Sequence, residues 1–353
     1  MALTASKAYS AALQRVYTAL DLSALCGTSV LVTGSTGMLG SCLVDALMQW
    51  NAKQAFPCRV IVSGRNEAAA RARFTAYRDC PNFSFIRQDI IDPLKGFPDT
   101  IDYIVHAASY ADPVNFSRFP VDTLLSNVVG TDHLLQYGIA HGMMRFLYVS
   151  SGEMYGQPLL PGDDFTEDYC GAVDHSNARS CYPAGKRAGE VLCQAYVRQY
   201  GSDAVIVRPC HLFGPTMTAS DSRAASEFLR NAADGRDILL KSAGLVERSH
   251  CYVMDAVRAL LLVLLSGKCG EAYNIADKVY QMRIRDFAEK AASAGGCRVM
   301  FANPNDLEAK GYSTVSRAVL DNAKLIALGW SPGSTGIDAI RETVKILREV
   351  KRV

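Results

Sequence analysis

Three glycines at a fixed spacing follow the first strongly apolar run of the chain and restrict the folds that it can adopt. The run is SVLVT (29–33), and the residues after it place Gly34, Gly37 and Gly40 in a G-x-x-G-x-x-G arrangement. Such a loop lets the backbone turn tightly into a helix and approach a pyrophosphate, which the positive end of the helix attracts. A glycine-rich turn without a ligand is the alternative. Because the triplet lies between a strand pattern and a helix pattern, it predicts dinucleotide binding.

Short β-branched runs alternate with longer amphipathic segments from residue 28 to about residue 207. The runs that we predict to be strands are SVLVT (29–33), RVIVS (59–63), FSFIRQD (83–89), DYIVHAA (102–108), RFLYVSS (145–151) and DAVIVRP (203–209). Runs of this kind, separated by helical segments, indicate a parallel sheet covered on both faces. The predicted fold is α/β, a Rossmann-type doubly wound parallel sheet with a smaller C-terminal α/β substrate domain.

The domain boundaries are predicted from the point where this alternation ends. Residues 1–24 are expected to be an N-terminal helical extension packed on the next domain. Residues 25–207 are the predicted NAD(P)-binding domain, to which a return segment at about 245–276 contributes a strand and a helix. Residues 208–353 are the predicted substrate domain. No low-complexity linker separates the two parts, so we expect them to pack tightly.

The end of the second predicted strand lacks the acidic residue that often binds the adenosine ribose hydroxyls in dinucleotide folds. In RVIVSGRN that place is taken by Gly64, which is followed by Arg65. A carboxylate would repel a 2′-phosphate, whereas a guanidinium attracts one. The cofactor is therefore NAD or NADP, and Arg65 makes NADP plausible. Alternatively, Arg65 stacks on adenine or faces water.

A tyrosine and a lysine four residues apart begin a predicted helix in CYPAGKRAGE (181–190). The spacing places Tyr182 and Lys186 on one helical face, and Pro183 suits a first turn. A nearby ammonium stabilises a phenolate, so we expect the pKa of Tyr182 to fall from about 10 toward working pH. The phenol would then act as a base. An ordinary amphipathic helix is the alternative.

Two further polar residues follow the predicted strand at 145–151, in YVSSGEMYG. Ser151 is placed to hydrogen-bond a substrate oxygen, and Glu153 is a candidate acid or base. Both lie where parallel sheets bind their ligands, at the carboxyl ends of the strands.

Together, the glycine loop, Ser151, Tyr182 and Lys186 resemble the extended short-chain dehydrogenase/reductase superfamily, also called the NAD-dependent epimerase/dehydratase superfamily. Within it the chain is most similar to the UDP-glucuronate decarboxylases (UDP-xylose synthases). The motifs that carry this likeness occur in the family's order and are HAASYADPVNF (106–116), NVVGT (127–131), SSGEMYG (150–156), EDYCG (167–171), RSCYPAGKRAGE (179–190), FGPTM (213–217), DSRAASEF (221–228) and ERSHCYVMDAV (247–257). The likeness covers about residues 28 to 275.

The resemblance implies an enzyme that oxidises a nucleotide-sugar transiently at C4 with a tightly bound NAD(P). Tyr182, assisted by Lys186, would take the proton from the 4-hydroxyl, and Ser151 would hold the same oxygen. The implied substrate-binding residues are His211, Arg223 and Arg248; a surface ion pair is the alternative for Arg248. The implied cofactor contacts are the three glycines, Arg65, Tyr182, Lys186, Thr36, Met38, Leu39, Asp89, Ile90, Ala107, Ala108, Asn127, Ser150 and Pro209.

Departures from the family pattern affect the predicted reaction. Gly152 stands where the decarboxylases have Ser and the dTDP-glucose dehydratases have Asp, and His211 replaces a substrate-contacting Asn. Glu153 is kept, as in decarboxylases and dehydratases, whereas 4-epimerases usually have a neutral residue there. We therefore predict lyase chemistry, with decarboxylation first and 4,6-dehydration second. A 4-epimerase, an NADP-dependent ketoreductase and an inactive cofactor-binding regulatory protein remain as alternatives.

Composition excludes several other classes of protein. The net charge of +2 with 20% charged residues gives no basic stripe for nucleic acid, and the histidines show no metal-ligand spacing. Eleven cysteines without a C-x-x-C pair indicate reduced, buried thiols in a cytoplasm. The N-terminal segment does not resemble a signal peptide, and the longest apolar run, 259–265, is too short to cross a membrane. Finally, the resemblance implies a homodimer formed through helices at about 121–140 and 182–200.

Overall fold

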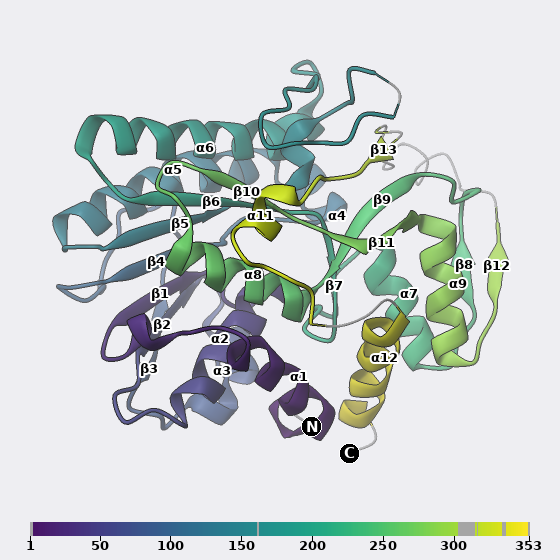
Figure 1. The fold of residues 1–353 in the computed structure, drawn as a ribbon, viewed down its shortest axis with the longest axis horizontal. Coiled ribbons are helices and arrows are strands. Elements are labelled where there is room, and N and C mark those ends of the chain that lie inside the picture. Colours follow the sequence, from purple (N-terminus) through teal and green to yellow (C-terminus); the bar gives the residue numbers. More distant parts are fainter. Residues whose placement is uncertain (1–2, 161, 303–314, 316, 334–336, 352–353) are drawn as a thin grey trace.

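A seven-stranded sheet forms the centre of the structure, a computed structural model that describes residues 3–160, 162–302, 315, 317–333 and 337–351. The strand order is β10-β6-β5-β4-β1-β2-β3, and every neighbouring pair is parallel (Figure 1). The strands are β1 Ser29–Thr33, β2 Arg59–Gly64, β3 Phe83–Arg87, β4 Tyr103–His106, β5 Arg145–Val149, β6 Ala204–Pro209 and β10 Ala272–Ile275. The predicted doubly wound parallel sheet is confirmed.

Helices cover both faces of this sheet. Successive side chains of a strand point to opposite faces, so a strand that is apolar throughout needs cover on both. Val30 and Val32 of β1 belong to the larger core, whereas Leu31 between them packs in a second core with Leu134 and Tyr196. In Figure 1, α5 and α6 lie on one side of the sheet and α1, α2 and α8 on the other. These helices are α1 Lys7–Thr18, α2 Met38–Asn51, α5 Pro120–Ala140, α6 Cys181–Tyr200 and α8 Val253–Ser266.

Three predicted strands end earlier than expected, at the edge where their carboxyl ends meet. β3 ends at Arg87, β4 at His106 and β5 at Val149, each two residues before the predicted end. The pairing register places Ser63, Thr33 and His106 side by side at this edge. The residues that follow these ends are therefore loops, which surround the position where open parallel sheets bind their ligands.

The N-terminal helix α1 is joined to the sheet domain through a buried carboxylate on α2. The Tyr9 hydroxyl donates a hydrogen bond to Asp45 at 2.5 Å, and the Tyr77 hydroxyl donates another at 2.9 Å. Arg73 forms an ion pair with the same carboxylate. Because Asp45 is fully buried, these partners supply the compensation that a buried charge needs. Helix α1 is thus part of the main core.

A second group of short strands and helices lies beside the carboxyl edge of the central sheet (Figure 1). Strand β9 pairs with β7, β11 and β13, and β8 pairs with β12. The elements are β7 His211–Phe213, α7 Ala224–Ala233, β8 Ile238–Leu240, β9 Glu247–Tyr252, β11 Asp277–Arg283, α9 Ile284–Gly295, β12 Val299–Phe301, β13 Arg317–Ala318 and α12 Ile337–Lys351.

The return segment at about 245–276 differs from the prediction in its first strand. That strand, β9, does not join the central sheet but pairs with β7, His211 opposite His250. The helix α8 and the following strand β10 make the return, and β10 lies parallel to β6. Nearly all residues of β9 are buried, so its sequence suits either sheet and its pattern does not specify the partner.

The remaining elements are short and connect the larger ones. They are α3 Glu67–Arg73, α4 Pro113–Arg118, α11 Ala323–Ala327 and the 3-10 turns η1 Leu3–Ala5, η2 Ser23–Leu25, η3 Thr75–Tyr77, η4 Gly152–Tyr155 and η5 Ala178–Ser180. All eleven cysteines lie in described residues and none forms a disulfide. The prediction that they are buried is wrong for Cys26, Cys170 and Cys269, which are exposed because they lie in loops.

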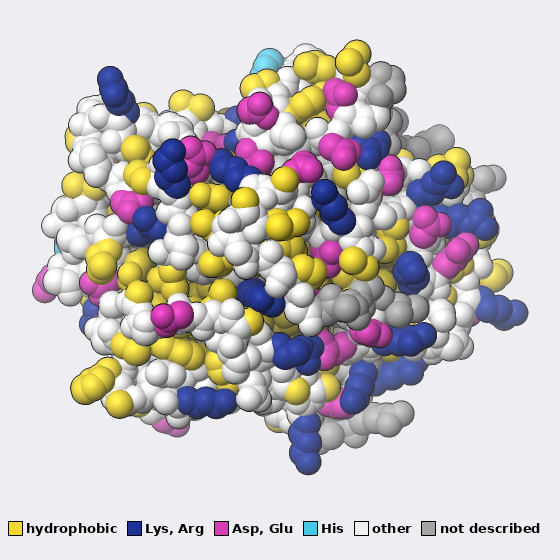
Figure 2. All heavy atoms as spheres, viewed as in Figure 1, with side chains coloured by type: hydrophobic (Ala, Val, Ile, Leu, Met, Phe, Trp, Pro, Cys, Tyr) yellow, Lys and Arg dark blue, Asp and Glu magenta, His cyan; other side chains and the backbone are white. Residues whose placement is uncertain are grey.

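Helix apolarity and surface charge bear on the predictions about membranes and nucleic acid. Across the part of the chain that the structure describes, no helix combines the length and apolarity that a bilayer span needs. On the face shown in Figure 2, basic and acidic side chains are interspersed.

Candidate active site

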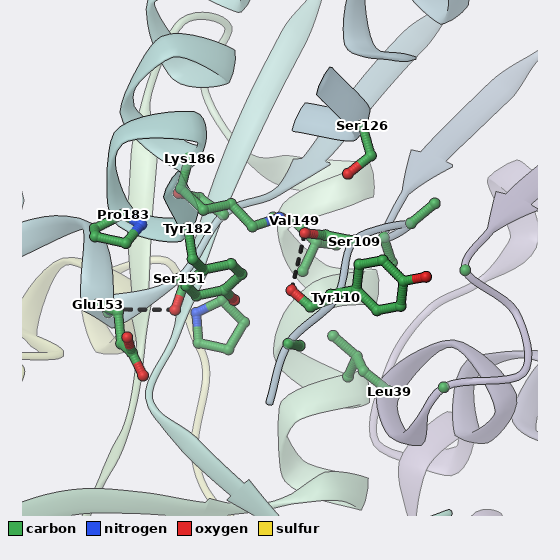
Figure 3. A pocket seen from close by; sticks show the side chains of 18 of the residues that line it. Leu39, Ser109, Tyr110, Ser126, Val149, Ser151, Glu153, Tyr182, Pro183 and Lys186 are labelled. Atoms are coloured by element: carbon green, nitrogen blue, oxygen red, sulfur yellow. Dashed lines mark hydrogen bonds between the residues drawn. The ribbon is translucent and has the colours of Figure 1, made fainter. Parts of the chain in front are cut away.

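A cavity of about 570 Å³ lies along the carboxyl edge of the central sheet. It begins at the end of β2, passes the glycine loop and the ends of β4 and β5, and reaches the smaller sheet at β7 and β9. Figure 3 shows side chains from several of these segments pointing into it. One cavity therefore touches both the sheet and the C-terminal group of strands.

The glycine loop forms the wall of this cavity between β1 and α2. Gly34 has a φ of +65°, and a Cβ there would lie 2.4 Å from the carbonyl oxygen of Ala107. A Cβ on Gly40 would lie 2.5 Å from the carbonyl oxygen of Gly34. Helix α2 begins at Met38, so its first N–H groups face the loop. Larger residues do not fit here, and the resulting cradle suits the pyrophosphate of a dinucleotide.

Most of the predicted cofactor contacts line this cavity. They are Gly34, Thr36, Gly37, Met38, Leu39, Gly40, Arg65, Asp89, Ile90, Ala107, Ala108, Ser150, Tyr182, Lys186 and Pro209. Asn127 is buried behind the wall instead, where its amide donates to Ser109 at 2.9 Å and its oxygen accepts from Tyr148 at 3.0 Å. Its effect on a ligand would therefore pass through Ser109, which does line the cavity.

The three predicted catalytic groups meet at the end of β5. Ser151, Tyr182 and Lys186 all line the cavity and are buried (Figure 3). The Lys186 Nζ donates a hydrogen bond to the carbonyl of Val149 at 2.7 Å and lies 5.7 Å from the centre of the Tyr182 ring. The sequence thus correctly predicts the position of Tyr182 and Lys186 on one face of α6.

The predicted direction of the pKa shift of the Tyr182 phenol is wrong. Burial raises the pKa of Tyr182 to about 12, and the hydrogen bond with Ser151 offsets this only in part. Burial also lowers the pKa of Lys186 to about 7. Both shifts arise because a low-dielectric site disfavours charge.

Glu153 lies in the turn η4, directly after Ser151. Its backbone N–H donates to the Ser151 Oγ at 3.1 Å, which orients the serine. Burial raises the pKa of the Glu153 carboxyl, while Arg179, Arg248 and Arg223 act in the opposite direction. A carboxyl group with a raised pKa beside a serine and a tyrosine is suited to acid–base work.

Arg179 is a site residue that the sequence did not indicate. Its Nη2 lies 3.8 Å from the Glu153 Oε2, and its Nε has no hydrogen-bond partner among the residues that the structure describes. The guanidinium lies 5.4 Å from the centre of the Phe116 ring, which stacks on Tyr182 at 5.1 Å. The available signal was its position three residues before Tyr182 in the sequence, in the turn η5 that precedes α6.

The predicted substrate residues His211, Arg223 and Arg248 line the end of the cavity at the smaller sheet. Arg248 donates to the carbonyl of Val315 at 2.6 Å, and burial lowers its pKa to about 10. Arg223 pairs with Asp221 at 2.6 Å. Burial and the nearby cations lower the pKa of His211 well below its usual value, so the imidazole is neutral.

Two other contacts explain departures from the family pattern. A Cβ on Gly152 would lie 3.0 Å from the Leu320 side chain, so this leucine occupies the space near the missing side chain. At the opposite end, the Arg65 guanidinium lies 4.9 Å from the centre of the Tyr110 ring and 3.7 Å from Asp89. Neither Leu320 nor Tyr110 was predicted to belong to the site. No group of metal-ligating side chains occurs within the described ranges.

Several known proteins are similar to this chain in sequence or in fold. UDP-glucuronic acid decarboxylase 6 of Arabidopsis thaliana is 37% identical over 242 residues, 68% of this chain and 67% of the relative. UDP-glucuronic acid decarboxylase 1 of Xenopus tropicalis is 29% identical over 323 residues, 91% of this chain and 72% of the relative. A dTDP-glucose 4,6-dehydratase from Streptomyces venezuelae, solved with NAD bound, has a TM-score of 0.76 and 27% identity, covering 92% of this chain and 98% of that chain. Residues 30–276 match the NAD dependent epimerase/dehydratase family, and this protein belongs to it.

Proposed function

We propose that this protein oxidises a nucleotide-linked uronic acid at C4 with a bound NAD(P) and then removes its carboxylate as carbon dioxide. The relatives described above support this reaction, because both are UDP-glucuronic acid decarboxylases. Residues 25–207, with the return segment, would bind the dinucleotide, and residues 208–353 would bind most of the nucleotide-sugar.

The observation that carries the proposal is the charge around Glu153. Three guanidinium groups, those of Arg179, Arg223 and Arg248, act on this one carboxyl. Arg223 is neutralised by Asp221 and Arg248 donates to backbone carbonyls, whereas the buried Nε of Arg179, a residue of the cavity wall, has no hydrogen-bond partner among the described residues. An excess of cations suits a ligand with a diphosphate and a carboxylate, since guanidinium groups bind both well.

The first half of the reaction would use Ser151 and Tyr182. The Ser151 hydroxyl would donate a hydrogen bond to the substrate O4, and the Tyr182 oxygen would take the proton of that hydroxyl. When bound, the oxidised nicotinamide supplies a hydride acceptor and a positive charge at this end of the cavity. Because burial keeps the phenol protonated, its own proton would have to leave as it takes the proton of O4, and the amine of Lys186, with a pKa of about 7, would receive it.

The second half would use Arg179 and Glu153. A ketone at C4 makes the C6 carboxylate a β-keto acid, so the C5–C6 bond breaks and its electron pair moves to C5 and the C4 oxygen. Arg179 would orient the carboxylate before this step. Glu153 would then deliver a proton to C5, which its raised pKa favours. The C4 ketone would finally take back the hydride and the proton held at Tyr182, so that no dinucleotide is consumed.

Decarboxylation is favoured over 4,6-dehydration by the contact between Gly152 and Leu320. Expulsion of a C6 hydroxyl needs an acid near C6, and Gly152 supplies none. The Leu320 side chain fills the adjacent space with apolar atoms. Epimerisation at C4 is disfavoured because it leaves Glu153 without a role.

The assembly and the compartment are also proposals. We propose a homodimer through α5 and α6, since Val121, Leu124 and Val191 on these helices are exposed apolar side chains. Apolar exposed positions on two adjacent helices suit a four-helix interface. We propose a cytoplasmic location, which the unpaired cysteines support.

A panel of nucleotide-sugars analysed by mass spectrometry tests the reaction. The proposal predicts that a nucleotide-linked uronate loses the mass of carbon dioxide, without consumption of added NAD(P)H. Loss of the mass of water from a neutral hexose would establish dehydration instead. A product of unchanged mass but altered chromatographic retention would establish epimerisation.

A further inference from the structure

The end of β2 and the loop after β4 make a contact that crosses the proposed dinucleotide site. In the sheet, β1 lies between β2 and β4, and Ser63, Thr33 and His106 are aligned at the carboxyl edge. The glycine loop begins immediately after Thr33. Any contact between the segments that follow Ser63 and His106 must therefore pass across the start of that loop.

Arg65 and Tyr110 make this contact. Their strands are two spacings apart, about 9–10 Å, so only long side chains reach across. The Arg65 guanidinium lies 4.9 Å from the centre of the Tyr110 ring, a cation–π distance. Both residues line the cavity (Figure 3 labels Tyr110), so they bound the space next to the glycine loop.

Each member of the pair is held from its other side. The Tyr110 ring stacks on Phe119 at 5.3 Å and 16°, at the start of α5. Arg65 lies 3.7 Å from Asp89, and Asp122 also attracts its charge. The ion pair is half-exposed and long, so it holds the guanidinium weakly and allows it to move aside.

We propose that Arg65 and Tyr110 form a clasp that closes across the bound dinucleotide and slows its release. This inference rests on the proposed dinucleotide binding. The proposed reaction returns the hydride to the same sugar. If the reduced dinucleotide dissociated before that step, the oxidised sugar would have no hydride donor. A clasp built from two side chains slows that loss without occupying the other end of the cavity, which Arg248 lines.

Release of NADH from the full-length protein tests the clasp. The protein is loaded with NADH and mixed with excess NAD, and the loss of bound-NADH fluorescence gives the release rate. We expect Tyr110→Leu to speed release about tenfold and Arg65→Gln about fivefold, the scale of lost aromatic and cation–π contacts. Arg71→Gln, which alters an exposed arginine on α3, is the control and should leave the rate unchanged.

The double variant distinguishes a clasp from two separate contacts. If the two side chains act together, Arg65→Gln with Tyr110→Leu should release NADH at nearly the rate of the faster single variant. If both single variants bind NADH and release it at the wild-type rate, the clasp is wrong, and the proposed reaction is unaffected. A wild-type protein that binds neither NADH nor NADPH would overturn both proposals.

Discussion

The ammonium of Lys186 is fixed to the end of β5 by a 2.7 Å hydrogen bond to the carbonyl of Val149. Two aromatic rings also lie near it, with the centre of the Tyr148 ring at 5.0 Å and that of the Tyr182 ring at 5.7 Å. Burial in this apolar position lowers the pKa of the amine to about 7. Lys186 can therefore gain or lose a proton at neutral pH.

The lowered pKa of Lys186 makes the stability of the protein depend on pH. The folded protein releases this proton near pH 7, whereas the unfolded chain keeps it to about pH 10. Between these values the unfolded state binds more protons, so this group makes the free energy of unfolding rise with pH, by at most about 1.4 kcal/mol per pH unit. Lys186→Met should be most stable relative to wild type below pH 7 and lose that advantage progressively up to about pH 10. Urea denaturation over this range gives the difference, and a pH-independent difference would contradict the shift.

Tyr182→Phe should abolish turnover, because it removes the only oxygen of that side chain. A lost general base costs about 10²–10⁴-fold in rate or more. The ring remains stacked on Phe116, so the affinity for NADH, measured by fluorescence titration, should change little. Near-wild-type turnover of the variant on its substrate would show that another group takes the proton.

Glu153→Gln should separate the two halves of the reaction. The variant keeps the shape of the side chain and loses its basicity, so C4 oxidation should continue and the second half should slow about a hundredfold or more. Stopped-flow absorbance should then show reduced nicotinamide accumulating on the protein. Glu67→Gln, an exposed residue on α3, is the matched control. Turnover at the wild-type rate in Glu153→Gln would remove this residue from the mechanism.

Arg65→Gln should change the choice between NADP and NAD. A charge-assisted contact with a 2′-phosphate contributes about 1.5–3 kcal/mol, or roughly ten- to a hundredfold in affinity. We expect NADP to bind wild type at least as well as NAD, and the variant to lose at least tenfold more affinity for NADP. Titration calorimetry with both dinucleotides measures this. An equal loss of affinity for NADP and NAD would show that Arg65 does not contact a 2′-phosphate.

Glu190→Gln should destabilise the fold, because it leaves the Arg208 guanidinium without its counter-charge. Arg208 donates to Glu190 at 3.0 and 2.6 Å, and both side chains are buried. Breaking a buried pair costs about 3–5 kcal/mol. The exposed pair of Glu289 with Arg285 offers the control, since Glu289→Gln should change the free energy of unfolding by less than about 1 kcal/mol. Equal effects of the two variants in chemical denaturation would contradict this assignment.

Features that depend on neighbouring residues were predictable from the sequence. The glycine triplet, the strand runs and the spacing of Tyr182 and Lys186 each express a local requirement, such as the φ of +65° at Gly34. The order of these motifs then predicted the family.

Features that depend on distant segments were not predictable in this way. Whether burial or a neighbouring charge sets the pKa of Tyr182 depends on packing from several elements. Leu320 meets Gly152 across 168 positions of the chain, and Phe116 brings Arg179 and Tyr182 together from a separate helix. The pairing of β9 was missed for the same reason, because a buried strand pattern does not specify its partner.

The central claim is that C4 oxidation leads to loss of the C6 carboxylate and protonation at C5. Incubation with UDP-glucuronate in deuterated buffer, followed by mass spectrometry, tests it most directly. The account predicts a product that has lost carbon dioxide and carries one solvent deuterium at the carbon that was C5. A product that retains the carboxylate would contradict it.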